Sequence, residues 1–157
     1  IILMMNNSEH RGKKNDVALR NIYASLLFRN KDLNPDLVTE LLGIKPLKKF
    51  KKGESYGIQR VKTRQTGFWY VSTEDYVQSD NIEHHLLWLL EKIERVTESF
   101  MEIVSREKLD VEITCVLQMY SIEDGFSVSA ITLKRIAELK IRFGVSLYCL
   151  GGSGNWS

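Results

Sequence analysis

A strongly basic segment, residues 45–64, is the part of this sequence best suited to contact a charged partner. It holds eight Lys and Arg residues against a single acid, Glu54, so its formal charge is +7, whereas the whole chain carries +2. Such a segment attracts phosphate groups or an acidic protein surface and speeds encounter with them. Aromatic residues that can stack on bases follow it, at Phe68, Trp69 and Tyr70. Unless the segment is only a solvated loop, the candidate partner-binding residues are Lys48, Lys49, Lys51, Lys52, Arg60, Lys62, Arg64 and Trp69.

The rest of the chain is acidic, with a formal charge of −5, and offers an alternative binding surface. Six carboxylates recur after the aromatic segment: Glu74, Asp75, Asp80, Glu83, Glu91 and Glu94. Together they would form an acidic face suited to a basic protein such as a nuclease. The division of charge leaves both surfaces open as the binding face.

No arrangement of residues typical of an active site occurs in the sequence. His84 and His85 are adjacent, so on a helix they point about 100° apart and form a surface pair rather than a metal site. Cys115 and Cys149 each lie in an apolar run, where a thiol is buried and weakly reactive. A Gly-x-Ser-x-Gly elbow, a phosphate-binding loop and a His-Glu-x-x-His motif are all missing. We therefore expect no enzyme activity, metal, cofactor or small-molecule substrate.

Length and composition indicate one globular domain. The chain has 157 residues and a mass of 18.2 kDa, enough for one domain and too little for two. Apolar residues make up 43% of it, and no apolar run approaches the roughly 20 residues that span a bilayer. Since its two cysteines suggest reduced core thiols, we expect a cytoplasmic protein with no membrane partner. We expect residues 1–16 to be disordered or expression-derived, residues 17–150 to form the domain and residues 151–157 to be a flexible Gly/Ser tail.

Local signals predict a strand, a short helix and a hairpin in the first half of the chain. Residues 17–29 include the apolar–polar alternation of a half-buried strand. The sequence N-P-D-L-V-T-E-L-L-G, residues 34–43, has a capping Asn, a Pro in the first turn and a terminal Gly, which predicts a helix. Residues 56–63 and 68–73 are then predicted to pair with each other as a hairpin.

The second half is predicted to hold a long helix, a strand, a short helix and a final strand. Asp80 and Glu83 have the spacing of a capping box, and apolar residues follow at helical spacing, so we expect one helix over about residues 80–107. Residues 111–120 and 141–150 alternate like strands on either side of a short helix. Strands with one apolar face favour an antiparallel sheet. The predicted fold is α+β: a two-layer sandwich in which a mainly antiparallel sheet of about four to five strands has its helices packed on one face.

Several segments together resemble a known family. The matching segments are Asn34–Pro46, Lys51–Glu54, Thr66–Ser72, Glu83–Leu86 and Val111–Cys115. Their order, over about residues 17–150, resembles the uncharacterised bacterial family called domain of unknown function 4279. The resemblance implies a small bacterial cytosolic α+β domain, with no established activity, catalytic residue or cofactor.

These observations together favour a binding function. We expect a non-catalytic protein-binding domain, most concretely an immunity protein that neutralises a bacterial toxin, because small domains of this sort are often encoded near secreted toxins. A nucleic-acid-binding module that uses residues 45–64 is the alternative. Its weakness is the sequence pI of about 8.5, since the pI of such domains usually exceeds about 9.

Overall fold

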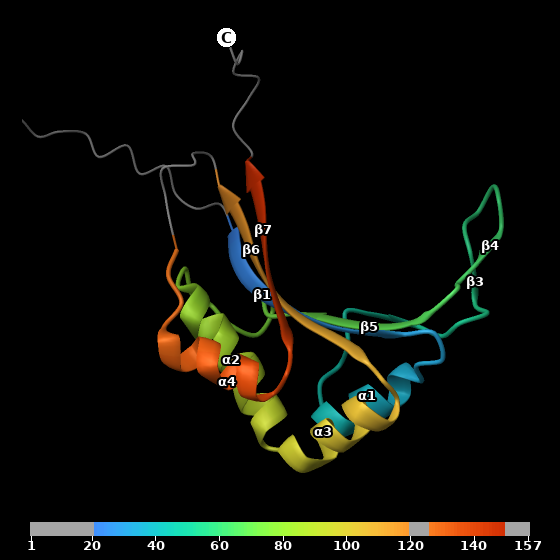
Figure 1. Ribbon diagram of the computed structural model, residues 1–157. Coiled ribbons are helices and arrows are strands. Elements are labelled where there is room, and N and C mark those ends of the chain that lie inside the picture. Colours follow the sequence, from blue (N-terminus) through green and yellow to red (C-terminus); the bar gives the residue numbers. More distant parts are fainter. Residues whose placement is uncertain (1–20, 120–125, 150–157) are drawn as a thin grey trace, which may run out of the picture.

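A mixed five-stranded sheet forms one layer of the fold (Figure 1). The computed structural model describes residues 21–119 and 126–149, without the side chains of Met119 and Cys149, and the expected terminal segments 1–16 and 151–157 lie outside these residues. The strands are, in spatial order, β2 (Lys48–Phe50), β5 (Gly67–Ser72), β1 (Asn21–Asn30), β6 (Asp110–Met119) and β7 (Arg142–Cys149). Neighbouring strands are antiparallel except β6 and β7, which are parallel because a helical crossover connects them.

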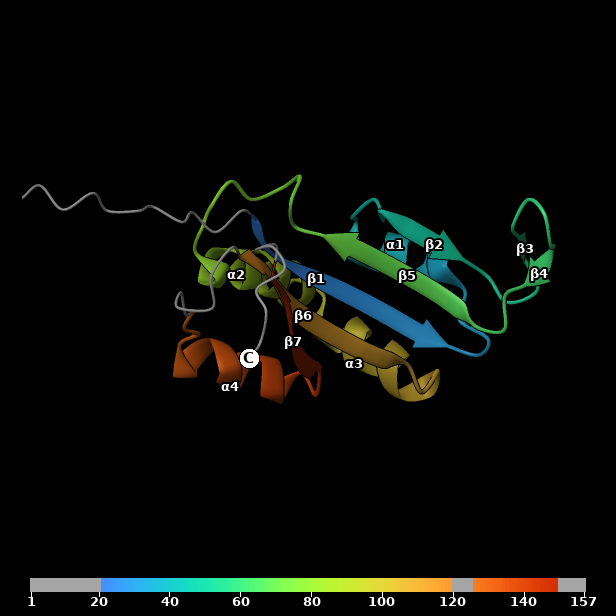
Figure 2. The ribbon, with the colours of Figure 1, turned by 90° about the horizontal axis from the view of Figure 1, so that it is seen from above.

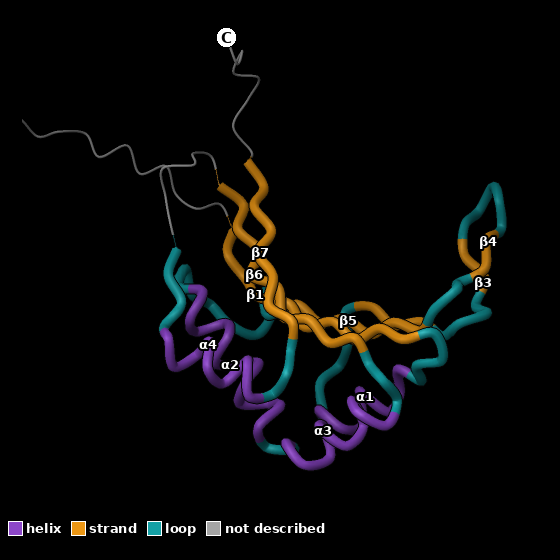
Figure 3. Tube along the Cα trace, in the orientation of Figure 1, coloured by secondary structure: helices purple, strands orange, loops and turns teal. Residues whose placement is uncertain are grey.

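The helices of the described residues all lie on one face of this sheet and leave the other face open (Figures 1 and 2). They are α1 (Pro35–Leu42), α2 (Ile82–Glu94), α3 (Thr97–Arg106) and α4 (Ala130–Glu138). α1 packs against β5, α2 against β1, and α4 against β7. The sheet bends so that its open face is concave (Figure 3). The architecture is the predicted two-layer α+β sandwich.

α1 forms where its local signals predict it. The Asn34 side chain accepts a hydrogen bond from the Asp36 N–H at the N-terminus, and Pro35 occupies the first turn. Gly43 ends the helix with φ at 63°, a left-handed conformation that lets its N–H donate to Thr39 O. These interactions are all local, which is why the sequence alone is enough to predict them.

The single helix expected over residues 80–107 is wrong, because Val96 divides it into α2 and α3. Val96 has φ −131° and ψ 28°, outside the helical region. The break redirects the chain, and Phe100 is fully buried with its ring centroid 6.1 Å from that of Phe28. Apolar spacing continues across the break without Gly or Pro, so packing against the sheet overrides the local helical preference.

The hairpin predicted between residues 56–63 and 68–73 does not form. β5 pairs instead with β1 on one side and β2 on the other, so both of its edges are used inside the sheet. Residues 51–66 leave the sheet as a projecting arm, in which β3 (Ser55–Tyr56) pairs with β4 (Lys62–Thr63). In Figure 2 this arm extends beyond the ends of β2 and β5.

Aromatic side chains centre the core between the sheet and the helices. Trp69 of β5 is fully buried, and its ring meets that of Phe28 edge-on at 5.5 Å. Its indole Nε1–H donates to Thr39 Oγ1 of α1 at 3.0 Å, so the polar end of the ring is also satisfied. This burial removes Trp69 from the candidate partner-binding residues, because a side chain without exposed area cannot contact a partner.

Candidate functional site

Alternation along β2 divides the basic segment between the two faces of the sheet. Lys48 lies opposite Tyr70, on the open face. Lys49 lies opposite the buried Trp69 and therefore faces the helices. The lysines of the segment lie at the surface, but they do not share one face.

Three of the candidate lysines are paired with acids from the neighbouring turn and helix. Lys49 Nζ lies 2.6 Å from one carboxylate oxygen of Asp36, and Lys51 Nζ lies 2.8 Å from the other. Hydrogen bonds from Lys49 and Lys51 lower the pKa of Asp36 to about 2. Lys52 Nζ lies 3.1 Å from Asp32. Asp32 and Asp36 thus lie against the basic segment and offset part of the +7 that its own residues carry.

The remaining candidates, Arg60, Lys62 and Arg64, lie on the arm. The Arg64 guanidinium carbon is 4.1 Å from the centroid of the Phe50 ring and 3.7 Å from that of Tyr56. The contact with Phe50 attaches the arm to the end of β2, and the contact with Tyr56 lies within the arm. Arg60 and Lys62 are exposed, so their charges can meet a partner.

Two apolar residues at the tip of the arm, Ile58 and Val61, are candidates that the charge pattern does not reveal. Ile58 is fully exposed, at 101%, and Val61 is 72% exposed. Gly57 turns the chain beside them with φ at 93°, and a Cβ there would lie 2.6 Å from Arg60 O. The sequence signal that would have found them is a pair of β-branched residues next to a turn glycine in a polar segment.

A row of aromatic rings crosses the open face beside the arm. The rings of Phe50, Phe68 and Tyr70 are stacked, with successive centroids 4.9 Å and 6.2 Å apart. All three side chains are half-buried, because no described helix covers this face. Arg64 lies over Phe50 at one end of the row, and Lys48 lies opposite Tyr70. The row is thus a flat apolar surface with cations at its edge.

Tyrosines extend this aromatic surface toward β7. The strand registers place Tyr23, Tyr70 and Tyr148 on the open side of the sheet. Burial raises the pKa of Tyr23 to about 12, and the nearby Tyr70 and Glu74 add to the rise. Burial also raises the pKa of Tyr70. These two phenols are therefore protonated at neutral pH and can donate hydrogen bonds.

Ion pairs balance the charges at the β6–β7 side of the open face. Arg29 Nη2 lies 2.7 Å from Asp110, and Arg142 Nη2 lies 3.2 Å from the same carboxylate. Arg142 also pairs with Glu112. Excess positive charge on the open face is therefore concentrated near the arm.

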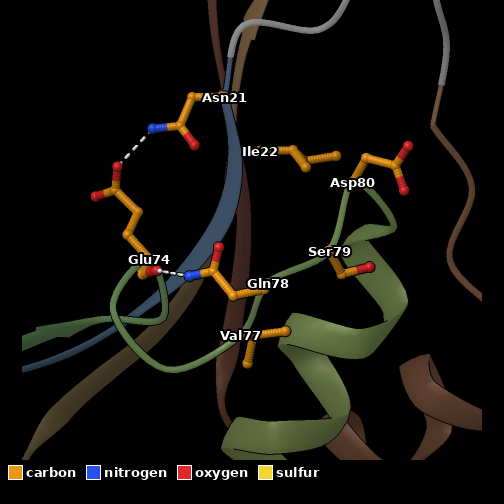
Figure 4. Close-up of a pocket in the computed structure, with 7 residues that line it drawn as sticks. All are labelled: Asn21, Ile22, Glu74, Val77, Gln78, Ser79 and Asp80. Atoms are coloured by element: carbon orange, nitrogen blue, oxygen red, sulfur yellow. Dashed lines mark hydrogen bonds between the residues drawn. The ribbon is translucent and has the colours of Figure 1, made fainter.

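The six acidic candidates do not form a single face, contrary to the expectation. Glu74 and Asp80 line a surface pocket of about 500 Å³ between the start of β1 and the loop before α2 (Figure 4). Asp75 is exposed in that loop, whereas Glu91 pairs with an arginine of its own helix. The carboxylates are dispersed because Glu74, Asp75 and Asp80 precede α2, whereas Glu83, Glu91 and Glu94 lie along it.

Glu83 connects α2 to α4 instead of contacting a partner. Asn81, rather than Asp80, caps α2, so the Glu83 carboxylate does not complete the predicted capping box. It accepts hydrogen bonds from Ser129 N–H at 3.0 Å, from Ser129 Oγ at 2.7 Å and from Thr132 Oγ1. Burial alone would raise the pKa of Glu83, but these hydrogen bonds outweigh it and lower the pKa.

Glu94, the last acidic candidate, also joins α2 to α4. Its two carboxylate oxygens accept from Arg135 Nε at 2.8 Å and from Arg135 Nη2 at 2.7 Å. This bidentate pair lowers the pKa of Glu94 and raises that of Arg135. Glu83 and Glu94 thus position a helix rather than offer free charge to another molecule.

The two adjacent histidines are not a surface pair as expected, because only His84 is exposed. His85 is 1% exposed, and its Nε2–H donates to Ser79 O at 2.9 Å. His85 Nδ1 lies 2.6 Å from Thr73 Oγ1, and the Thr73 hydroxyl donates to Ala24 O at 3.0 Å. Thr73 Oγ1 in turn accepts from the Ala24 N–H. His85 therefore holds the loop before α2 against β1.

Metal-binding groups and the Cys115 thiol were the remaining features to locate within the described residues. No three His, Cys, Asp or Glu side chains of the described residues are grouped so that they could hold a metal ion. In the same part of the chain, no helix combines the length and apolar character needed to cross a membrane. Cys115 is a fully buried free thiol, and burial raises its pKa to about 12, with Glu83 adding to the rise. A thiol with that pKa is a poor nucleophile at neutral pH.

Comparison with known proteins identifies a family. No curated protein and no solved structure matches this chain. A family model described as a domain of unknown function (DUF4279) matches residues 20–150, which is most of the 157-residue chain. The chain belongs to this family, as the motifs around α1, β5 and α2 had indicated.

Proposed function

We propose that this chain is a non-catalytic cytoplasmic protein that binds another protein on the concave open face of its sheet, beside the arm. The observation that supports this most is the composition of that surface. A row of stacked aromatic rings meets an arm whose tip exposes Ile58 and Val61. The centres of protein interfaces favour aromatic side chains and Arg and contain few other charged residues.

The concrete form of this proposal is an immunity protein that neutralises a bacterial toxin. Such a protein needs a stable scaffold and a complementary surface, but no catalytic group. Arg60 and Lys62 on the arm favour an acidic region of the toxin, which the field of the arm would attract. We therefore place the contact at the arm and the aromatic row rather than at the pocket lined by Glu74 and Asp80.

Nucleic-acid binding is the second candidate, because Phe50, Phe68 and Tyr70 present a stacking surface on an open sheet. Cations of the arm would then contact phosphates. The pairing of three lysines with Asp32 and Asp36 weakens this candidate, since these lysines already have anionic partners. The two apolar residues at the tip of the arm also favour a protein.

A double variant at the tip, Ile58→Asp with Val61→Asp, tests the proposal. Both side chains are exposed, so the fold should persist while the arm loses its apolar tip and gains negative charge. The matched control is Ile131→Asp on α4, where an equally apolar side chain is 72% exposed. We expect the double variant to bind a toxin domain that co-purifies with the wild-type protein from its native host at least about tenfold more weakly, and the control to bind normally.

Two measurements decide between the candidates. Calorimetry with the purified toxin domain reports affinity, and growth during co-expression reports neutralisation. Fluorescence anisotropy with a labelled single-stranded RNA, at about 50 mM and about 200 mM salt, reports nucleic-acid binding and its salt dependence. RNA binding with a steep salt dependence, together with no effect of the double variant on protein binding, would contradict the proposal and support the alternative.

A further inference from the structure

Three tyrosines and one carboxylate come together on the open face, away from the arm. Tyr23 of β1, Tyr70 of β5 and Tyr148 of β7 all lie on this face. The β1–β5 register, continued past Ser72, places Glu74 beside Tyr23. Besides burial, the Tyr70 and Tyr148 phenols and the Glu74 carboxylate raise the pKa of Tyr23, so these four polar groups lie near one another. We call Tyr23, Tyr70, Tyr148 and Glu74 the tyrosine cluster.

Hydrogen bonds fix the Glu74 carboxylate beside the three phenols. Asn21 Nδ2 donates to one of its oxygens (Figure 4), and Ser72 Oγ donates to the other at 3.0 Å. Each carboxylate oxygen has a second lone pair, so both can still accept a hydrogen bond from a ligand. The carboxylate is thus held in place without losing its capacity to bind.

The charge of Glu74 is not neutralised by a neighbouring cation. None of the ion pairs within residues 21–119 and 126–149 includes Glu74, whereas Asp110 and Glu112 both pair with arginines. Lys48, the described cation that the β2–β5 register places next to the tyrosine cluster, lies opposite Tyr70, four residues before Glu74. The cluster therefore carries one free negative charge, and its complement is a cation.

The phenols determine which kind of cation fits. Burial keeps Tyr23 and Tyr70 protonated at neutral pH, so their oxygens can accept hydrogen bonds and their ring faces attract positive charge. A guanidinium group is planar and carries five N–H donors, so it can stack on a ring while it donates to a carboxylate. An ammonium group is a more strongly hydrated point charge and costs more to remove from water.

We infer that the tyrosine cluster binds the guanidinium group of an arginine side chain that belongs to the protein partner. This inference rests on the proposed function and adds the orientation of the partner to it. The arm, with Arg60 and Lys62, projects from one end of the sheet, whereas the tyrosine cluster lies toward the other end (Figure 1). A partner that presents an acidic region to the arm and an arginine to the cluster is complementary to the open face in only one orientation.

Titration of the full chain with a short peptide, acetyl-Gly-Arg-Gly-amide, tests the site without the partner. We expect the backbone amide NMR signals of Tyr23, Tyr70 and Glu74 to shift with a Kd of about 1 to 10 mM at low salt. The same peptide with citrulline in place of arginine has the same shape but no charge, and it should bind at least about tenfold more weakly. A lysine peptide should bind about threefold more weakly than the arginine peptide, and tighter binding of lysine would overturn the choice of guanidinium.

Matched variants test which residues form the site. Glu74→Gln keeps the size of the side chain and should weaken binding of the arginine peptide about tenfold. Asp75→Asn removes the same charge from the next residue, which is also exposed, and should change the affinity less than about twofold. Because Tyr148 is 54% exposed, Tyr148→Ala leaves the core intact, and it should weaken binding about threefold.

The outcomes separate this inference from the proposed function. Equal affinities of the arginine and citrulline peptides, or of wild type and Glu74→Gln, would overturn the inference even if the toxin domain binds. Specific binding of the arginine peptide supports the inference even if the variant Ile58→Asp with Val61→Asp has no effect on toxin binding. That second result would contradict only the proposed contact at the arm.

Discussion

Replacing Glu83 by Gln isolates the contact that holds α4 on α2. One carboxylate accepts hydrogen bonds from Ser129 N–H, Ser129 Oγ and Thr132 Oγ1. Gln keeps the size of the side chain but replaces one acceptor oxygen with a donor, so at least one of these three groups loses its partner. Hydrogen bonds to a charged group contribute about 1.5–3 kcal/mol. We therefore expect Glu83→Gln to lower the free energy of unfolding by about 2 kcal/mol.

Urea denaturation followed by circular dichroism measures this loss. With a slope of about 2 kcal/mol per molar urea, the midpoint should fall by about 1 M. Glu91→Gln is the matched control, because Glu91 lies on the same helix but pairs with Arg95 at the surface. Exposed pairs of this spacing contribute only about 0.3–0.5 kcal/mol. Coincident curves for the two variants would show that Glu83 does not hold α4 in place.

The pH dependence provides a second check on the same contact. Because the pKa of Glu83 is lowered in the folded state, its contribution is complete above the unfolded pKa of about 4.3 and is lost as pH falls through the lower folded pKa. The difference in unfolding free energy between wild type and Glu83→Gln should therefore be largest at neutral pH and shrink below about pH 4. A difference that stays constant into strong acid is incompatible with an ionised Glu83 in this contact.

Three further changes probe the core and the arm. Cys115 should react with a thiol reagent only after denaturation, and rapid labelling of Cys115 in native protein, detected by mass spectrometry, would contradict its burial. Trp69→Phe removes the hydrogen bond to Thr39 and leaves a cavity. The free energy of unfolding, measured in urea, should therefore fall by about 2 kcal/mol. An unchanged free energy would disprove this packing. Gly57→Ala forces a Cβ against Arg60 O. Amide hydrogen exchange should therefore accelerate in residues 55–63 and stay unchanged in the sheet. Equal acceleration of exchange in the arm and in the sheet would be inconsistent with a separate arm.

Features that depend on nearby residues could be predicted from the sequence. α1 begins at Asn34 and Pro35 and ends at Gly43, because each of these residues acts through hydrogen bonds or dihedral preferences within one turn. The alternation of apolar and polar residues along β1 and β6 likewise indicates which side chains face the core. Because the apolar residues share one face of the sheet, the pattern is enough to predict one layer of helices on that face. The exposed arm cations also follow from sequence, since unpaired charges are rarely buried.

Features that depend on distant residues were decided only by the tertiary structure. Lys48 and Lys49 face opposite sides because β2 pairs with β5 in one particular register, and no local signal specifies that register. His85 is buried because Thr73 and Ser79 fold over it and satisfy both ring nitrogens. The helix break at Val96 follows from packing against the sheet. In each case the deciding contact joins residues that are far apart in the sequence and meet only once the strands have paired. No periodic pattern of residues in the sequence therefore indicates it.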